Sequence, residues 1–239
     1  MSRLHPRPPD PPSGEFWLAR IDLFHGLERE RVQEIAASSR IVRLEAGSHF
    51  FRLGQPALDL YALLEGRAKL TLESAEGYQV LFGFLRPGQT FGWSGFESSE
   101  THRSSALAVR ECKALAWPQK TMNGFLERIP HLAFTALRLQ VHLLFEAQSR
   151  FLELATEPVE RRLARSLLRL ARQAPEETGP GVRIDPPVTR QDLADMTATS
   201  VFTVSRILSR WQRKGIVETG RMRIEVRDAL GLERLAGER

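Results

Sequence analysis

The chain has 239 residues, of which 42% are hydrophobic and 26% charged, so it is long enough for two domains with buried cores. It contains no run of about 18 apolar residues and no apolar segment near its start, which excludes a membrane-spanning helix and a signal peptide. The net charge is +5, and residues 156–239 carry sixteen Lys and Arg against twelve Asp and Glu, a balance of +4 that favours a polyanionic partner for this part.

The number of cysteines and the prolines near the start of the sequence are also informative. The single cysteine, Cys112, excludes an internal disulfide and indicates a cytoplasmic protein. Residues 1–15 include the Pro-rich sequence His5–Gly14 and are predicted to form a disordered tail.

Residues 16–128 are predicted to form a β-domain. Its first part, Leu18–Ala37, has helical spacing and comes before the strands. Gly and Pro turn signals separate short apolar segments, and the β-rich pattern extends to about Asn123. Such short strands are typical of a β-roll or jelly roll. The predicted strands are Ser39–Glu45, His49–Leu53, Leu60–Leu64, Ala68–Leu72, Tyr78–Leu85, Ser105–Val109 and Ala114–Trp117.

Residues 129–155 are predicted to form one long helix that begins near Pro130. Apolar residues recur along it at alternating spacings of three and four, which is the pattern of a coiled-coil seam between two copies of the chain. The alternative is a helix packed on its own β-domain, and Leu132, Leu139 and Leu143 form a second apolar stripe suited to that contact. The seam consists of Phe134, Leu137, Val141, Leu144, Gln148, Phe151 and Ala155.

Residues 156–239 are predicted to be a separate helical domain. Pro158 interrupts the long helix, and Val159–Gln173 is an amphipathic helix whose arginines suit a solvated face. Ala174–Pro187 is a polar loop or a small hairpin.

Thr189–Leu208 has the pattern of a helix-turn-helix. Thr189 caps a first helix with Asp192 in its first turn, the sequence from Thr197 to Thr199 breaks that helix, and Ser200 caps a second helix that runs through Trp211.

Apolar and polar residues then alternate on both sides of Gly220, which predicts a hairpin over Gly215–Val226 and therefore a winged helix. Arg221 and Arg223 would lie on this wing beside the DNA phosphates.

The helix-turn-helix resembles that of the Crp/Fnr family, which includes the cyclic-AMP receptor protein. The order of β-domain, long helix and winged helix resembles the family over nearly all of the chain after residue 16, and Leu81–Gly92 is similar to the strand and turn that lead into its effector pocket. The resemblance implies an α+β fold with an N-terminal β-roll of the cyclic-nucleotide-binding type, a dimerisation helix and a C-terminal winged helix-turn-helix.

The function that this resemblance implies is sequence-specific transcription regulation. A homodimer would bind a pseudo-palindromic site on double-stranded DNA and act with RNA polymerase, and no membrane would be involved. The residues expected at the DNA are Thr189, Arg190, Gln191, Ser200, Val201, Phe202, Ser205 and Arg206, together with Arg221 and Arg223.

Four positions of the helix-turn-helix either depart from the family's pattern or have an alternative role. Ala198 replaces a common glycine at a left-handed turn, at a cost of about 1 kcal/mol. Val201 and Phe202 replace charged groups and could contact thymine methyl groups, although Phe202 could instead pack under the wing. Arg206 matches the arginine that reads guanine through O6 and N7, and its alternative is a surface salt bridge.

The predicted effector pocket keeps only part of the family's nucleotide site. Arg103 and Ser104 match the pair that holds the phosphate of cyclic AMP, but Trp93 follows Gly92 where the family has a glutamate for the ribose. Ala147 and Gln148 replace the hydroxyl residues that read adenine. Cyclic AMP is therefore not the expected effector, and the effector is left unidentified.

Other cofactors and functions are limited by the residues present. One cysteine excludes an iron–sulfur cluster, and no catalytic motif occurs, so we expect no enzyme. Heme stays open because candidate axial ligands exist, although they show no ligand spacing; they are His25, His49, His102, His131 and His142. The rival functions are a heme- or gas-sensing regulator on the same scaffold and a cyclic-nucleotide-binding interaction module that does not bind DNA specifically.

Overall fold

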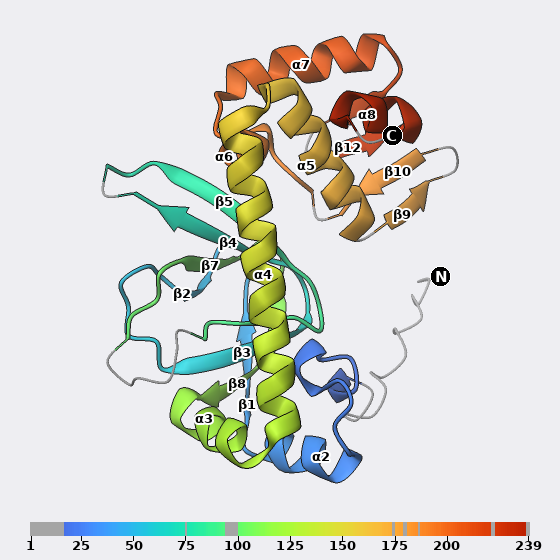
Figure 1. Cartoon of the computed structure of the whole chain (residues 1–239). Coiled ribbons are helices and arrows are strands. Elements are labelled where there is room, and N and C mark those ends of the chain that lie inside the picture. Colours follow the sequence, from blue (N-terminus) through green and yellow to red (C-terminus); the bar gives the residue numbers. More distant parts are fainter. Residues whose placement is uncertain are drawn as a thin grey trace, which may run out of the picture. The chain divides into compact units, whose positions relative to one another are not determined.

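The computed structural model describes residues 17–74, 76–93, 100–173, 175–178, 181–185, 187–220 and 223–237 (Figure 1). The chain divides into two compact units. The first consists of Met1–Ala68 and Leu85–Gln140, and the second of Lys69–Phe84 and Val141–Arg239. None of the helices formed by the described residues is long and apolar enough to cross a membrane. The predicted Pro-rich tail lies outside the described residues. The domain boundaries expected from the sequence stay a prediction.

The β-rich part forms two four-stranded sheets with the strand orders β1-β8-β3-β6 and β2-β7-β4-β5. The seven predicted strands are confirmed with ends that differ by at most two residues, and β6 is additional. Gly66, at φ +91°, joins β3 to β4 where a Cβ would lie 2.1 Å from the Glu111 carbonyl oxygen, so only glycine fits this turn. The strands are β1 (Arg40–Leu44), β2 (His49–Phe51), β3 (Asp59–Glu65), β4 (Ala68–Glu73), β5 (Gln79–Leu85), β6 (Thr90–Phe91), β7 (Ser105–Ala108) and β8 (Cys112–Pro118).

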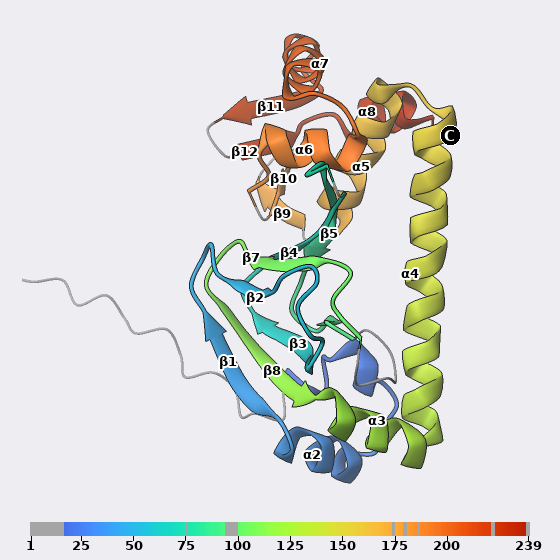
Figure 2. The same cartoon turned by 90° about the vertical axis from the view of Figure 1, so that its left-hand side faces the viewer.

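Three helical segments accompany the sheet of the first unit: η1 (Asp22–Phe24), α2 (Arg29–Ala37) and α3 (Gln119–Arg128) (Figure 2). The predicted continuous helical spacing over Leu18–Ala37 is broken at Gly26, whose φ of +82° cannot continue a helix. The β reading as far as Asn123 was wrong, because α3 begins directly after β8 with Pro118 as its N-cap and no turn residue between them.

The core of the first unit lies between these helices and the sheet. Trp117 is fully buried, donates from Nε1 to the Ile35 carbonyl oxygen at 2.7 Å, and packs edge-on against Phe24 with ring centroids 5.7 Å apart. Leu132 and Leu139 of the long helix pack against the same core, as their off-seam positions predicted.

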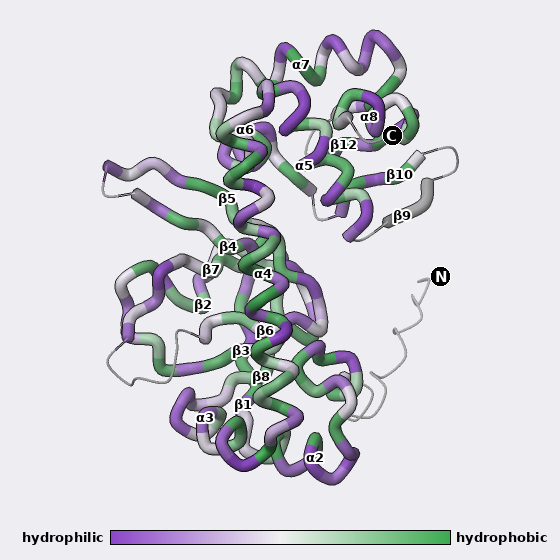
Figure 3. Tube along the Cα trace, in the orientation of Figure 1, coloured by the Kyte–Doolittle hydropathy of each residue, from purple (hydrophilic) through white to green (hydrophobic). Residues whose placement is uncertain are grey.

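The long helix α4 (Pro130–Thr156) has an apolar side without a partner among the described residues. Figure 3 shows apolar residues recurring along its length. The predicted seam residues Phe134, Leu137, Leu144 and Phe151 are 57–75% exposed, and Val141 is 40% exposed. Leu143 is also 40% exposed, and its expected packing on the β-domain stays a prediction.

The second unit contains the predicted winged helix-turn-helix with one more helix at its end. Its small sheet has the order β11-β12-β10-β9. Of the two possibilities for Ala174–Pro187, a polar loop or a small hairpin, the structure has the hairpin, as β9 and β10, whereas α8 was not predicted. The elements are α5 (Val159–Gln173), β9 (Pro175–Thr178), β10 (Gly181–Ile184), α6 (Arg190–Thr197), α7 (Val201–Arg213), β11 (Val217–Gly220), β12 (Arg223–Val226) and α8 (Ala229–Ala236).

Of the five α5 arginines, Arg162, Arg165 and Arg169 are engaged inside this unit, whereas Arg161 and Arg172 are exposed, so the expected solvated face is confirmed only in part. Arg162 donates to the Thr197 carbonyl oxygen, and Arg165 donates to that of Ala236, so both satisfy carbonyls at helix C-termini. Arg169 pairs with the buried Glu153 at 2.7 Å. These arginines therefore stabilise the domain and are not available to bind phosphate.

Candidate DNA interface and effector pocket

The first helix of the helix-turn-helix, α6, begins with the predicted cap. The Thr189 side chain accepts a hydrogen bond from the Asp192 amide, and the Asp192 carboxylate accepts one from the Thr189 amide at 2.9 Å, which completes a capping box. Lys69, at the start of β4, donates to the other oxygen of Asp192 at 2.7 Å. All three residues belong to the second unit.

The environment of Asp192 controls its charge. Burial raises its pKa, but the hydrogen bonds from Lys69 and Thr189 outweigh burial, so the pKa is lowered from its usual value. The carboxylate is therefore ionised at neutral pH and holds α6 at its N-terminus.

The turn between the two helices is left-handed at Ala198, with φ 47° and ψ 56°. Ala198 is the only described non-glycine residue with positive φ. Arg162 holds the preceding carbonyl, that of Thr197, at 2.8 Å, and the Thr197 hydroxyl donates to the Leu193 carbonyl oxygen. The turn is therefore left-handed with alanine in the place where glycine is common.

The second helix, α7, is fixed at both ends and along its inner face. Ser200 caps it by accepting from the Thr203 amide at 3.1 Å. Trp211 is fully buried and donates from Nε1 to Glu160 of α5, which also pairs with Arg210 at 2.6 Å. The other inward residues of α7 and those of α6 that face them are at most 5% exposed: Val204, Ile207 and Leu208 on α7, and Leu193 and Ala194 on α6.

The opposite face of α7 carries the four residues predicted to contact bases. In Figure 1, α7 lies at the edge of its unit, with α5, α6 and α8 on one side of it. Phe202 is 76% exposed and Val201 37%, Arg206 is exposed, and Ser205 is half-buried. Both alternatives fail among the described residues, because Phe202 is not packed under the wing and no ion pair of Arg206 is present there.

The remaining residues predicted to contact DNA differ in how free their side chains are to bind it. Arg190 and Gln191 are exposed on the first turn of α6, although Gln191 donates to Asp195. On the wing, Arg223 pairs with the buried Glu225 at 2.5 Å, so a phosphate would have to compete with that carboxylate. Arg221 lies outside the described residues.

Gly92 and Trp93 of the predicted effector pocket lie beside the core of the first unit. Gly92 has φ +88°, and a Cβ there would lie 2.9 Å from the Tyr61 ring and 3.1 Å from the Asp59 carbonyl oxygen. Trp93 is half-buried and packs against the core. An indole in contact with the core is not a substitute for a carboxylate that binds a ribose hydroxyl.

An aromatic cluster that the sequence did not indicate surrounds Gly92. His102 is buried and stacks on Phe51 at 3.7 Å, and Tyr61 stacks on Phe91 at 5.4 Å. Phe50 packs edge-on against Phe91 at 5.0 Å. Burial, reinforced by Asp59, raises the pKa of Tyr61 to about 12, so its hydroxyl is neutral. The interior of the β-roll beside Gly92 is therefore filled by aromatic rings that pack against one another.

The four other residues predicted for the effector pocket do not all belong to the same unit. Arg103 is exposed and Ser104 half-buried in the first unit, whereas Ala147 and Gln148 belong to the second. Their common pocket stays a prediction.

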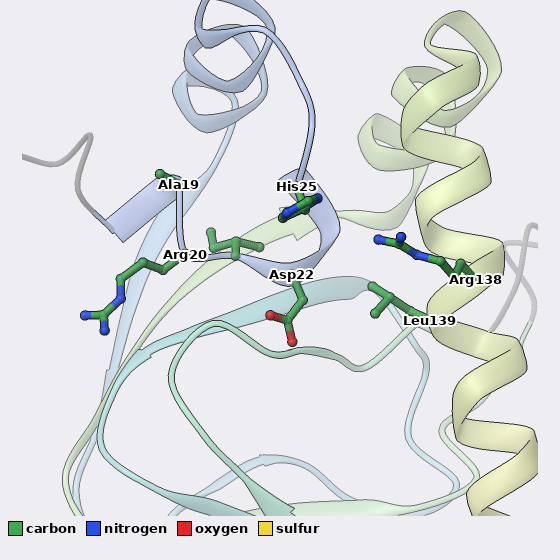
Figure 4. A pocket seen from close by; sticks show the side chains of 7 residues that line it. Ala19, Arg20, Asp22, His25, Arg138 and Leu139 are labelled. Atoms are coloured by element: carbon green, nitrogen blue, oxygen red, sulfur yellow. The ribbon is translucent and has the colours of Figure 1, made fainter. Parts of the chain in front are cut away.

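A hollow of about 370 Å³ in the first unit is lined by none of the predicted pocket residues. Figure 4 shows the Asp22 carboxylate, the His25 ring and the Arg138 guanidinium around it. Burial raises the pKa of Asp22, against the opposing effect of Arg86. Arg138 and His25 suit an anionic group, but nothing else marks this hollow as a site.

His131 and Cys112 each contact backbone carbonyl oxygens of the first unit. His131 contacts the His25 carbonyl oxygen at 3.1 Å through Nε2. The Cys112 thiol is buried, donates towards the carbonyl oxygens of Arg67 and Arg110, and has a raised pKa because of burial. The described residues contain no group of three or more His, Cys, Asp or Glu side chains that could hold a metal ion.

Comparison with known proteins matches both halves of the chain to protein families. Residues 41–129 match the cyclic nucleotide-binding domain, and residues 161–235 match the Crp-like helix-turn-helix domain. The cyclic AMP receptor protein of Thermus thermophilus is 32% identical over 215 residues, which cover 90% of this chain and 96% of that protein. The nitrogen fixation regulation protein FixK of Azorhizobium caulinodans is 28% identical and covers 85% of this chain and 82% of its own length.

A solved structure agrees with the fold. FixK2 from Bradyrhizobium japonicum superposes with a TM-score of 0.72 at 22% identity, over 82% of this chain and 96% of that one. The two domains and their order define a DNA-binding transcription regulator. The chain belongs to the Crp/Fnr family of such regulators, as its helix-turn-helix predicted.

Proposed function

We propose that the protein acts as a cytoplasmic homodimer that binds a pseudo-palindromic operator through α7 of each copy, together with RNA polymerase. The observation that carries this proposal is the outward face of α7, where Val201, Phe202 and Arg206 are exposed while the inward face is buried. Arg206 reads a guanine by donating to O6 and N7. Arg190, Gln191 and the wing arginines contact the phosphates and set the register.

The unpartnered side of α4 supports the dimer. Leu137, Leu144 and Phe151 are each more than half exposed on a helix of 27 residues, and they follow a heptad spacing. Exposing this stripe to water would be unfavourable for a single copy, and a second α4 would bury it. Two recognition helices would then meet half-sites one helical turn apart.

The effector is a molecule other than cyclic AMP. Trp93, at the position of the carboxylate that the resemblance assigns to the ribose hydroxyl, packs on the core instead. A buried ribose hydroxyl would therefore lack that acceptor. Heme-linked gas sensing stays the alternative, and a Soret band after incubation with hemin would favour it.

Selection from a random duplex library followed by a mobility-shift assay tests the proposal. We expect an inverted repeat whose half-site centres are 10–10.5 base pairs apart, or a multiple of that. A protein that binds all duplexes equally, with affinity set only by salt, would contradict it.

A further inference from the structure

Phe202 is a large apolar side chain that does not contribute to the hydrophobic core of its unit. Its ring is 76% exposed and makes no aromatic or cation contact with the other described residues. The inward face of α7 is complete without it, because Val204, Leu208 and Trp211 are fully buried. Single exposed apolar residues are common on proteins, so the position of Phe202 decides what it can do.

That position is the first turn of the recognition helix. Phe202 lies two residues after the Ser200 cap and four residues before Arg206, so the two side chains share one face of the helix. In helix-turn-helix proteins, the N-terminal residues of this helix contact base edges in the major groove. The rise between Phe202 and Arg206 is about 6 Å, or roughly two base steps.

The chemistry of the ring restricts what it can read. It neither donates nor accepts hydrogen bonds of ordinary strength, and the apolar group at the edge of a base pair in the major groove is the C5-methyl of thymine. 5-Methylcytosine carries a methyl group at the same place. A carboxylate at this position would instead accept from N4 of cytosine.

We propose that Phe202 reads the C5-methyl group of a pyrimidine in each half-site, within about two base steps of the guanine bound by Arg206. At that position thymine is bound better than uracil, and 5-methylcytosine better than cytosine. The inference rests on the proposed function, and it makes Phe202 a residue that determines operator specificity and renders binding sensitive to cytosine methylation.

The experiment replaces each thymine of the selected operator in turn by deoxyuridine, symmetrically in both half-sites. Burial of one methyl group corresponds to about fourfold in affinity for a half-site, and therefore about fifteenfold for two. We expect a loss of this size at one position for the wild-type chain. Phe202→Ala should bind the two duplexes equally, while Leu230→Ala, which truncates another exposed apolar residue (66%), should still distinguish them.

A second comparison places cytosine or 5-methylcytosine at the identified position. The wild-type chain should prefer the methylated duplex about fifteenfold, and Phe202→Glu should lose that preference and bind cytosine better than thymine.

Three outcomes would overturn the inference. Uracil could be tolerated at every position, or Phe202→Ala could keep the sensitivity to the same methyl group, which would make another residue the reader. A selection that enriches no sequence would instead contradict the proposed function, and the inference would fall with it.

Discussion

The left-handed turn at Ala198 makes a quantitative prediction about stability. An L-residue other than glycine pays about 1–2 kcal/mol in the left-handed region, and Ala198 occupies it at φ 47°. Glycine removes that cost but adds about 0.5–1 kcal/mol of conformational entropy to the unfolded chain. The two ranges leave a net gain between zero and about 1.5 kcal/mol. The middle of that range predicts that Ala198→Gly stabilises the second unit by about 0.5–1 kcal/mol.

The neighbouring contacts support a local effect. Arg162 and the Thr197 hydroxyl hold the chain just before the turn, and Ala198 itself is exposed, so no packing is lost when its methyl group is removed. For a unit of about a hundred residues, the gain corresponds to a rise in Tm of about 2–8 °C.

Equilibrium urea unfolding measures the change, and amide hydrogen exchange over 190–213 assigns it to the helix-turn-helix. Ala229→Gly is the matched control, since Ala229 is an exposed first residue of α8 with ordinary helical geometry. That variant should be destabilised by up to about 1 kcal/mol. An Ala198→Gly protein that is no more stable than the wild type would refute the assignment of strain to this turn.

Three further predictions concern assembly, the effector pocket and pH. Leu144→Glu should yield monomers in sedimentation and lose tight operator binding, whereas Leu230→Glu should remain dimeric; a dimeric Leu144→Glu protein would reject the seam. Calorimetry should detect no binding of cyclic AMP or cyclic GMP at micromolar concentrations, and Trp93→Glu should restore weak binding if the indole merely fills the ribose site; a micromolar Kd for the wild type would show that the pocket has been misread. The pKa of Asp192 is lower in the folded chain than its unfolded value of 3.8, so the stability that this carboxylate contributes is complete above pH 3.8 and is lost as pH falls through the folded pKa. Asp192→Asn should therefore lower the free energy of unfolding by roughly 1–3 kcal/mol at pH 7 and make stability less dependent on pH in acid. An unchanged loss of stability in acid would mean that other carboxylates cause it.

Much of the helix-turn-helix was predictable because its signals are local. The cap at Thr189, its partner Asp192 and the cap at Ser200 lie within three residues of the groups that they bind. The strands were predictable for a similar reason, since Gly and Pro turns such as Gly66 separate them. The seam of α4 was visible as a period. Its residues Leu137, Leu144 and Phe151 are exposed, but so are the off-seam residues Phe145 and Leu152, so the seam stays a prediction.

The unpredicted features depend on contacts between residues that are distant in sequence. Lys69 binds Asp192 across 123 positions, and Arg162 reaches the Thr197 carbonyl across 35. Neither contact could be predicted from the spacing of residues along the sequence. The aromatic cluster around Gly92 likewise arises only when strands fold together, although Phe50 and Phe51 in one short strand were a signal that could have been followed. The helix α3 was missed because no turn residue separates it from β8.

The central claim is that α7 reads DNA sequence through its outward face, and Arg206 tests it most directly. The measurement is the affinity of wild-type and Arg206→Ala proteins for the selected operator and for operators changed at one base pair of each half-site. We expect the variant to lose about 1–3 kcal/mol per half-site and to stop distinguishing a single guanine position. Equal weakening on every duplex, with the preference for that guanine unchanged, would make Arg206 a phosphate contact and contradict the claim.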